Sequence, residues 1–107
     1  MTNKTLSEQL CEVAAIKREV DFENNNDNFV RLFATILKVC DNFTFYTDVK
    51  EMITIDWFHS ETQLEEQYLD IGDTLITAVL KSAIKLIDYP YVGNQLSQSL
   101  QSENWSY

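Results

Sequence analysis

Carboxylates are the most numerous side chains in this sequence that could do chemistry, and they are concentrated near its middle. Between Val39 and Leu80 there are nine acidic residues and one basic residue, Lys50, a net charge of −8. The rest of the chain has eight acidic and seven basic residues, a net charge of −1. Clustered charge produces a focused negative field that speeds encounter with a basic partner, although solvated helix faces are also often acidic.

A metal-dependent hydrolase is one chemistry that such carboxylates could support. Glu65 and Glu66 lie close in sequence to Asp70 and Asp73, and the last three recur at four- and three-residue spacing, which suits one face of a helix. A Mg²⁺ site in a helical nucleotide hydrolase needs further carboxylates from a second helix, commonly as Glu-x-x-Glu, and the sequence contains no such pair. We therefore predict no metal ion and no cofactor.

The remaining catalytic signatures are missing from the sequence. His59 is the only histidine, and zinc sites need three or four nitrogen or sulfur ligands at tight spacing. Gly72 and Gly93 stand alone, so there is no glycine-rich phosphate loop, and no Gly-x-Ser-x-Gly elbow occurs. We predict that the protein is not an enzyme and has no catalytic residues.

Aromatic residues are interleaved with the acidic segment, and these are the residue types that most often anchor protein interfaces. We predict Trp57 and Tyr68 as anchors within a partner-binding surface. The predicted surface consists of Asp48, Glu51, Asp56, Trp57, Glu61, Glu65, Glu66, Tyr68, Asp70 and Asp73.

The element that must organise the fold is the segment Asp73–Tyr89, which is apolar almost all round when wound as a helix. Such a helix is normally buried in the centre of a domain. Asp73 is the predicted N-cap, and Pro90 prevents the helix from continuing.

Three further helices are predicted from caps and periodicity. Thr5 and Glu8 have capping-box spacing before an amphipathic helix that we expect to reach about Val20. Asn26 or Asp27 should cap a second helix that packs on the central one, and Asn94 a short, weak fourth. The last residues should fray unless Trp105 docks on the bundle.

Residues 42–73 are the hardest to assign. Phe43, Phe45, Ile53 and Ile55 alternate with polar positions as in a β-hairpin, but no Gly or Asn stands near the expected turn at Lys50. A helix fits the same residues, and we favour it. From Glu61 onward we expect an amphipathic helix that breaks at Gly72–Asp73.

Length and composition indicate one domain over residues 1–107. Two glycines and one proline are few for an all-β domain, and 45% hydrophobic residues are ordinary for a globular one. The predicted fold is all-α, a bundle of four to five helices around the buried central helix, with a small hairpin at residues 43–58 as the alternative. Cys11 and Cys40 are predicted to be buried, reduced thiols; a disulfide between their helices is the alternative.

The net charge of −9 disfavours binding to nucleic acid and to anionic membranes. With no signal-peptide pattern and no run of about 20 apolar residues, we expect a cytoplasmic protein. In charge and helical architecture, though in no motif, the chain resembles bacterial toxin-immunity proteins and phage DNA mimics. The resemblance implies a small acidic inhibitor of a basic protein, most simply an immunity protein against a nuclease-type toxin.

Three alternatives stay open at the level of sequence. The first is a DNA mimic that blocks a restriction or CRISPR nuclease, and the second is the metal-dependent hydrolase. The third is a regulatory subunit whose aromatic surface mediates self-association. The sequence does not determine the oligomeric state.

Overall fold

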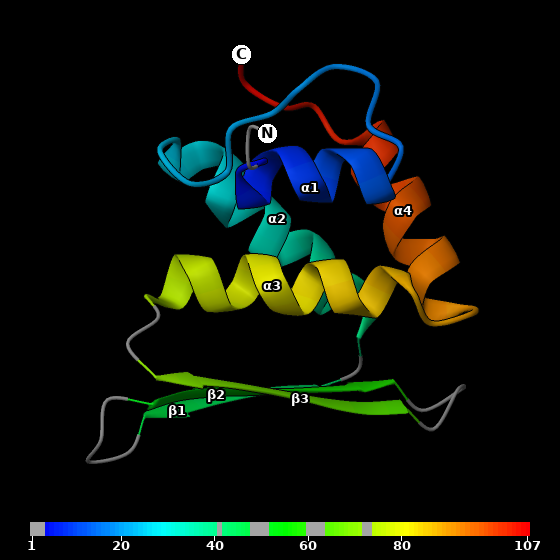
Figure 1. The fold of residues 1–107 in the computed structure, drawn as a ribbon. Helices are drawn as coiled ribbons and strands as arrows, with labels where there is room; N and C mark the ends of the chain where they lie inside the picture. The colour runs from blue at the N-terminus through cyan, green and yellow to red at the C-terminus, as the bar shows by residue number, and fades with distance from the viewer. Residues whose placement is uncertain (1–3, 41, 48–51, 60–63, 72–73) are drawn as a thin grey trace.

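The structure, a computed structural model, describes residues 4–40, 42–47, 52–59, 64–71 and 74–107, with the strands described by their backbone and pairing alone. The elements in chain order are helices α1 (Leu6–Val13) and α2 (Asn26–Val39), strands β1 (Asn42–Thr47), β2 (Met52–His59) and β3 (Leu64–Ile71), and helices α3 (Leu75–Ile87) and α4 (Val92–Ser102). Figure 1 shows three levels: the sheet, α3 above it, and α1 with parts of α2 and α4 on the far side of α3.

Helix α3 is the centre of this arrangement, as predicted. It contacts α1, α2, α4 and the strands β2 and β3. Ala78, Val79, Leu80, Ala83 and Leu86 are all fully buried in it. The predicted helical bundle around this segment is therefore confirmed, and so is the packing of α2 on the central helix.

The start of α3 differs from the prediction by one residue. Thr74 is the N-cap, and its hydroxyl oxygen accepts a hydrogen bond from the Thr77 N–H at 3.2 Å. The predicted cap, Asp73, lies outside the described residues. Ser82, fully buried in the helix, donates its hydroxyl to the Val79 carbonyl oxygen at 3.0 Å, so this buried polar group is satisfied within α3.

Helix α1 begins as predicted and ends earlier. The capping box of Thr5 and Glu8 is present, but the helix stops at Val13 rather than near Val20. Ala15 adopts φ 57°, the Ile16 N–H donates to the Cys11 carbonyl, and the Ala15 N–H donates to the Glu12 carbonyl. These bonds form a Schellman motif, which glycine normally supplies. Because alanine occupies the left-handed position, the sequence carried no stop signal there.

The chain after α1 turns back and contributes to the core. Val20 and Phe22 are fully buried although they lie in an irregular segment. The Val20 N–H donates to the Cys11 sulfur at 3.4 Å, and the Phe22 N–H donates to the Ser7 hydroxyl oxygen at 2.9 Å. Cys11 and Cys40 are both buried and neither is in a disulfide, which confirms the predicted buried, reduced thiols.

Helix α2 begins with Asn25 as its N-cap, one residue before the earlier of the two predicted caps. The Asn25 side chain accepts from the Asn28 N–H at 3.2 Å. Leu32 and Ile36 are fully buried, whereas Leu37, which follows the same helical spacing of apolar residues, is 43% exposed. The buried face of α2 is therefore narrower than the pattern of apolar residues in its sequence.

Residues 42–47, 52–59 and 64–71 form a three-stranded antiparallel sheet in the order β1-β2-β3. The hairpin alternative for residues 43–58 is confirmed, and the favoured helix over that stretch is wrong, as is the helix expected after Glu61. The alternation of apolar and polar residues and their high β-propensity favour strands at β1 and β2. Strand β3 has no comparable signal, and its pairing with β2 supplies the backbone hydrogen bonds that a helix would have made internally. The bundle is thus accompanied by a sheet layer, which an all-α description leaves out.

The corner between α3 and α4 is tight. Tyr91 has φ 79° and ψ −71°, and the Val92 N–H donates to the Pro90 carbonyl at 3.0 Å, so Tyr91 is the centre of a γ-turn. A Cβ on Gly93 would lie 2.0 Å from the Ile87 carbonyl oxygen. The close approach of the two helices requires glycine at this position. Helix α4 accordingly starts at Val92, before the predicted cap Asn94.

The C-terminal residues dock on the bundle because Trp105 is buried. Its indole N–H donates to the Leu100 carbonyl at 2.9 Å, and its ring meets Phe22 edge-on at 5.0 Å between centroids. Trp105 therefore docks on the bundle, and this is the case in which the last residues were predicted not to fray. Within the described residues, no helix combines the length and the apolar character that crossing a membrane requires.

Candidate functional site

The predicted partner-binding residues lie in the sheet and its connections. Asp56 and Trp57 are in β2, and Glu65, Glu66, Tyr68 and Asp70 are in β3. Asp48, Glu51, Glu61 and Asp73 lie outside the described residues. The structure therefore brings six of the ten residues onto two neighbouring strands, rather than onto the helices for which they were proposed.

The register divides these six residues between the two faces of the sheet. Trp57 is opposite Glu66, and Phe58 is opposite Glu65. Residues directly opposite each other share a face, and successive residues alternate between faces. Trp57, Glu66, Tyr68 and Asp70 therefore belong to one face.

Asp56 and Glu65 belong to the other face. Because α3 lies against one side of the sheet (Figure 1), a flat partner cannot meet all six residues from a single side. At an edge of the sheet both faces meet. The four residues in the outer strand β3 belong to such an edge, whereas Asp56 and Trp57 lie in the central strand β2.

That edge is formed by β3, which is an outer strand of the sheet. Its eight residues include Glu65, Glu66 and Asp70 and no basic residue. Charged residues on an edge strand prevent indiscriminate pairing with other strands and leave the edge accessible to an oppositely charged surface. The candidate site is therefore an acidic sheet edge.

The same register argues against the magnesium cluster. Glu65 lies on the face opposite to Glu66 and Asp70, and these residues are in a strand instead of on the helix face that their spacing suggested. Within the helical part that the structure describes, no group of three or more His, Cys, Asp and Glu side chains could hold a metal ion.

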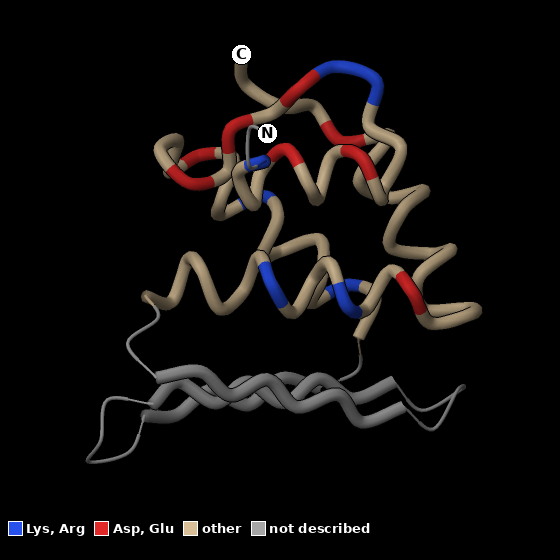
Figure 2. The backbone as a smooth tube through the Cα atoms, viewed as in Figure 1, with Lys and Arg blue, Asp and Glu red and all other residues tan. Residues whose placement is uncertain are grey.

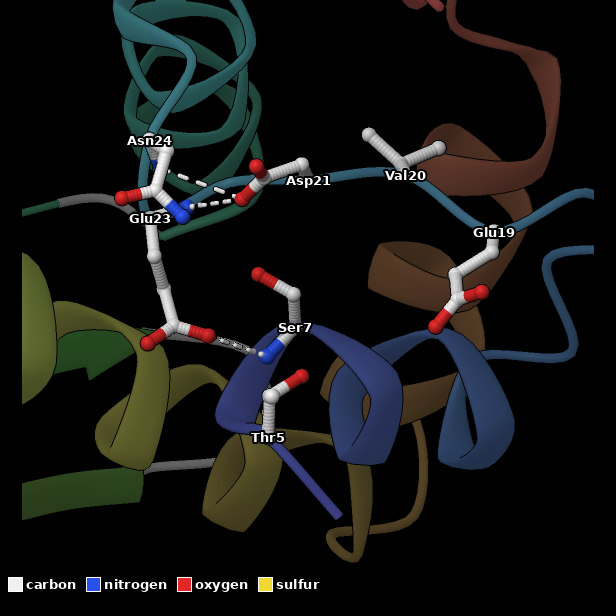
Figure 3. A pocket seen from close by; sticks show the side chains of 7 residues that line it. All are labelled: Thr5, Ser7, Glu19, Val20, Asp21, Glu23 and Asn24. Atoms are coloured by element: carbon white, nitrogen blue, oxygen red, sulfur yellow. Dashed lines mark hydrogen bonds between the residues drawn. The ribbon is translucent and has the colours of Figure 1, made fainter.

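The helical layer contains a cavity of about 380 Å³ between the start of α1 and the segment 19–24 (Figure 3). Thr5, Ser7, Glu19, Val20, Asp21, Glu23 and Asn24 line it. Two of its three carboxylates accept local backbone hydrogen bonds: Glu23 accepts from the Ser7 N–H at 3.0 Å, and Asp21 accepts from the Glu23 and Asn24 N–H groups at 3.0 and 3.1 Å.

These contacts have a structural purpose. The hydrogen bond from Asn24 is the main reason that the pKa of Asp21 lies below its usual value, with a further contribution from Glu23. Glu23 satisfies an N–H in the first turn of α1 that has no partner within the helix. These hydrogen bonds therefore hold residues 19–24 against α1, and the cavity between them does not bring catalytic groups together.

Cys11 is also unsuited to nucleophilic chemistry. Burial raises the pKa of its thiol, with a smaller rise from nearby Glu19 against a lowering by the Val20 backbone. A buried thiol with a raised pKa stays protonated at neutral pH and is inert.

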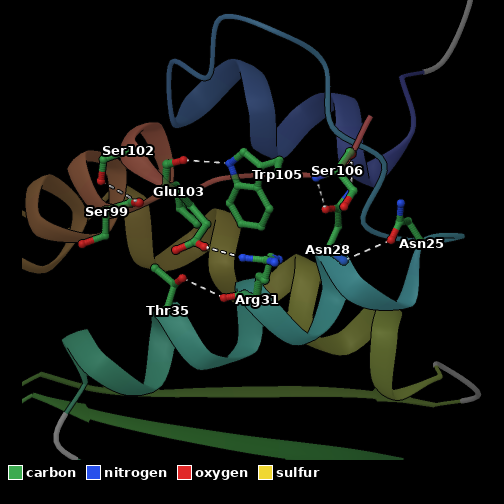
Figure 4. Close-up of polar contacts among 10 residues, drawn as sticks. Asn25, Asn28, Arg31, Thr35, Ser99, Ser102, Glu103, Trp105 and Ser106 are labelled. Carbon is green, nitrogen blue, oxygen red and sulfur yellow. Dashed lines mark hydrogen bonds and ion pairs between the residues drawn. The ribbon is translucent and has the colours of Figure 1, made fainter.

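A polar network holds the C-terminal segment against α2, and sequence reasoning missed it (Figure 4). Asn28, fully buried, donates to the carbonyls of Asp21 and Ser106 at 3.2 and 2.8 Å and accepts from the Ser106 N–H at 2.8 Å. Arg31 and Glu103 form an ion pair at 3.1 Å. Asn28 ends the polar run Glu23–Asn28, so nothing in the sequence marked it as a core residue.

A second cavity, also of about 380 Å³, adjoins this segment, with Lys17 and Arg18 on its wall. The Arg18 guanidinium lies 3.9 Å from the Tyr107 ring centroid, a cation–π contact. Figure 2 shows basic and acidic residues mixed along the helical layer. No part of the described helices carries a single-sign field like that of residues 41–73.

Comparison of the chain with protein-family models, with curated proteins and with solved structures finds no match. The functional argument therefore rests on the chain itself.

Proposed function

We propose that the protein binds and inhibits a basic protein, and that it acts as an immunity protein neutralising a bacterial toxin of the nuclease type. The observation that carries this proposal is the segregation of charge: nine acidic residues and one basic residue fall between Val39 and Leu80. The remaining residues are nearly balanced. A chain that needed acidic residues only for solubility would have no reason to gather them in one segment.

The proposed mechanism has two stages. The field of the acidic segment first steers a basic surface toward it, which raises the association rate. The edge strand β3 then covers the basic active site of the toxin with Glu65, Glu66 and Asp70. A nuclease must attract phosphates, so its active site is the kind of basic surface that such an edge fits.

Capture from the native host at low salt, with elution by rising salt, identifies the partner. The proposal requires a basic toxin or nuclease, released in stoichiometric amount, whose purified activity the protein abolishes. Recovery of no such partner at any salt concentration would overturn it.

The site is tested by a matched pair of triple variants against the identified partner. Glu65→Gln, Glu66→Gln and Asp70→Asn together should slow association about tenfold at low salt and flatten its salt dependence. Glu19→Gln, Asp27→Asn and Asp88→Asn together remove the same charge from exposed positions of the helical layer. This control should retain most of the association rate, and equal losses in both variants would exclude β3 as the site.

A further inference from the structure

The two edges of the sheet differ in charge. In the order β1-β2-β3, both β1 and β3 are outer strands. Strand β3 (LEEQYLDI) has three carboxylates, whereas β1 (NFTFYT) has no charged residue, no glycine and no proline. Each outer strand presents a row of backbone groups that its own sheet does not pair. Only β3 has the charges that keep other strands away.

The composition of β1 also suits pairing with another strand. Phe, Thr and Tyr make up five of its six residues, and these types have high β-propensity. In the part of the chain that the structure describes, β1 hydrogen-bonds to β2, and α3 covers β2 and β3. The outer side of β1 is thus a neutral, β-prone edge in a protein with a net charge of −9.

We infer that β1 pairs with β1 of a second copy, in antiparallel orientation, to make a six-stranded sheet with the order β3-β2-β1-β1-β2-β3. An antiparallel strand is self-complementary, so the interface is isologous and closes as a dimer. The twofold axis is then perpendicular to the sheet. Directly paired residues must share a face, so the axis passes through a residue position, Thr44 or Phe45. Both α3 helices lie on the same side of the joined sheet.

Electrostatics selects β1 over β3 for this contact. In the proposed dimer the two β3 strands are separated by five strand spacings, about 24 Å at about 4.8 Å each. That exceeds the Debye length of about 8 Å at physiological ionic strength, so their mutual repulsion is screened. Pairing through β3 would instead place two strands with three carboxylates each about one strand spacing apart.

The dimer and the proposed inhibition respond oppositely to salt. Two copies with a charge of −9 each repel one another, so added salt strengthens dimerisation. Binding to a basic partner is weakened by added salt. The inference does not depend on the proposed function, because a dimer through β1 leaves both acidic edges at the ends of the joined sheet.

Sedimentation velocity of the full chain, over a range of protein concentration at low and high salt, tests the inference. We expect a monomer–dimer equilibrium that shifts toward dimer at high salt. A monomer under all conditions, or a dimer that dissociates as salt is added, would overturn it.

A matched pair of substitutions locates the interface. Thr44 is opposite Asp56 and Asp56 is opposite Gln67, so Thr44 and Gln67 occupy the same row and face at opposite edges. Thr44→Lys places two like charges near the twofold axis and should weaken dimerisation at least tenfold. Gln67→Lys introduces the same charge at the other edge and should leave the dimer intact. Equal dimerisation of both variants would exclude β1 as the interface.

Mixing two variants of opposite charge distinguishes a variant that has lost the interface from one that no longer folds. Thr44→Lys and Thr44→Glu should each be monomeric when alone and should form a mixed dimer when combined. Circular dichroism of each variant checks that the secondary structure is retained. If both variants are folded and monomeric and their mixture stays monomeric, the antiparallel β1–β1 contact is wrong.

Discussion

The helical layer and the sheet layer of this molecule are built on different principles. In the helical layer, residues 4–40 and 74–107, eight acidic residues nearly balance seven basic ones, and ion pairs such as Arg31–Glu103 form between segments far apart in sequence. The segment that contains the sheet, residues 41–73, has nine acidic residues against Lys50 alone. The helices use mixed charge and a buried core, whereas the sheet concentrates charge of one sign.

The difference suggests that stability and recognition are assigned to different layers. A concentrated negative charge costs self-repulsion, which a nearly neutral, well-packed bundle can offset. Helix α3 contacts both layers, so the bundle holds the sheet in place. Substitutions in the helical layer should therefore change stability while leaving association kinetics of the folded protein unchanged.

Phe22→Ala should break the helical layer most severely. Phe22 is fully buried and packs edge-on against Trp105, so its removal leaves a cavity and should cost about 3–5 kcal/mol of the free energy of unfolding. Urea denaturation measures the loss. Hydrogen exchange should show that the amides of the sheet lose protection together with those of the helices, because α3 joins them. If the amides of the strands keep full protection, the two layers unfold independently and α3 does not couple them.

Alkaline pH should destabilise the helical layer through Cys11. Burial raises the pKa of this thiol in the folded state, so the unfolded chain releases its proton first as pH rises. The contribution of this thiol to the free energy of unfolding is fully present below the pKa of the unfolded thiol, near 9.0. It decreases above that pH until the folded thiol also ionises. The slope for one group is at most about 1.4 kcal/mol per pH unit.

Denaturation of the protein and of Cys11→Ala at a series of alkaline pH values isolates this effect. The difference in unfolding free energy between them should narrow as pH rises. A constant difference would show that ionisation of Cys11 is not linked to folding.

Ala15→Gly is the smallest expected change and should stabilise the protein. Ala15 has φ 57°, a conformation that glycine adopts without steric cost, so we expect a gain of about 0.5–1 kcal/mol. Ala34→Gly is the matched control, because Ala34 is exposed within α2 and should lose about 1 kcal/mol. Thermal unfolding distinguishes the two signs. If both substitutions lower the stability, the left-handed conformation of Ala15 is not a source of strain that glycine removes.

Several features of the fold could be predicted from the sequence because they depend on neighbours along the chain. The Thr5–Glu8 capping box, the apolar stripe of α2 and the burial of α3 follow from caps and a 3.6-residue period. The candidate site could be predicted only as a segment. Its residues were identified by charge, but their division between two faces depends on the register of β2 with β3.

The errors arose where distant parts of the chain compete with local preference. Residues 64–71 have spacings that suit a helix, and they became β3 because the hairpin before them offered an edge with which to pair. Leu37 has the spacing of the apolar stripe of α2 and is nevertheless 43% exposed, so its burial could not be predicted from periodicity alone. Asn28 lies in a polar run of the sequence, and the return of the C-terminus makes it a buried hydrogen-bonding centre.

The sequence by itself determined where charge gathers, which helix is central and that both cysteines are buried, because composition and periodicity act locally. Only the tertiary structure decided that the acidic segment contains the three strands of a sheet, that the two edges of this sheet differ in charge, and that Ala15 ends α1. A strand obtains its hydrogen bonds from a neighbour that is remote in sequence, and a left-handed alanine persists only when packing around it offsets the strain.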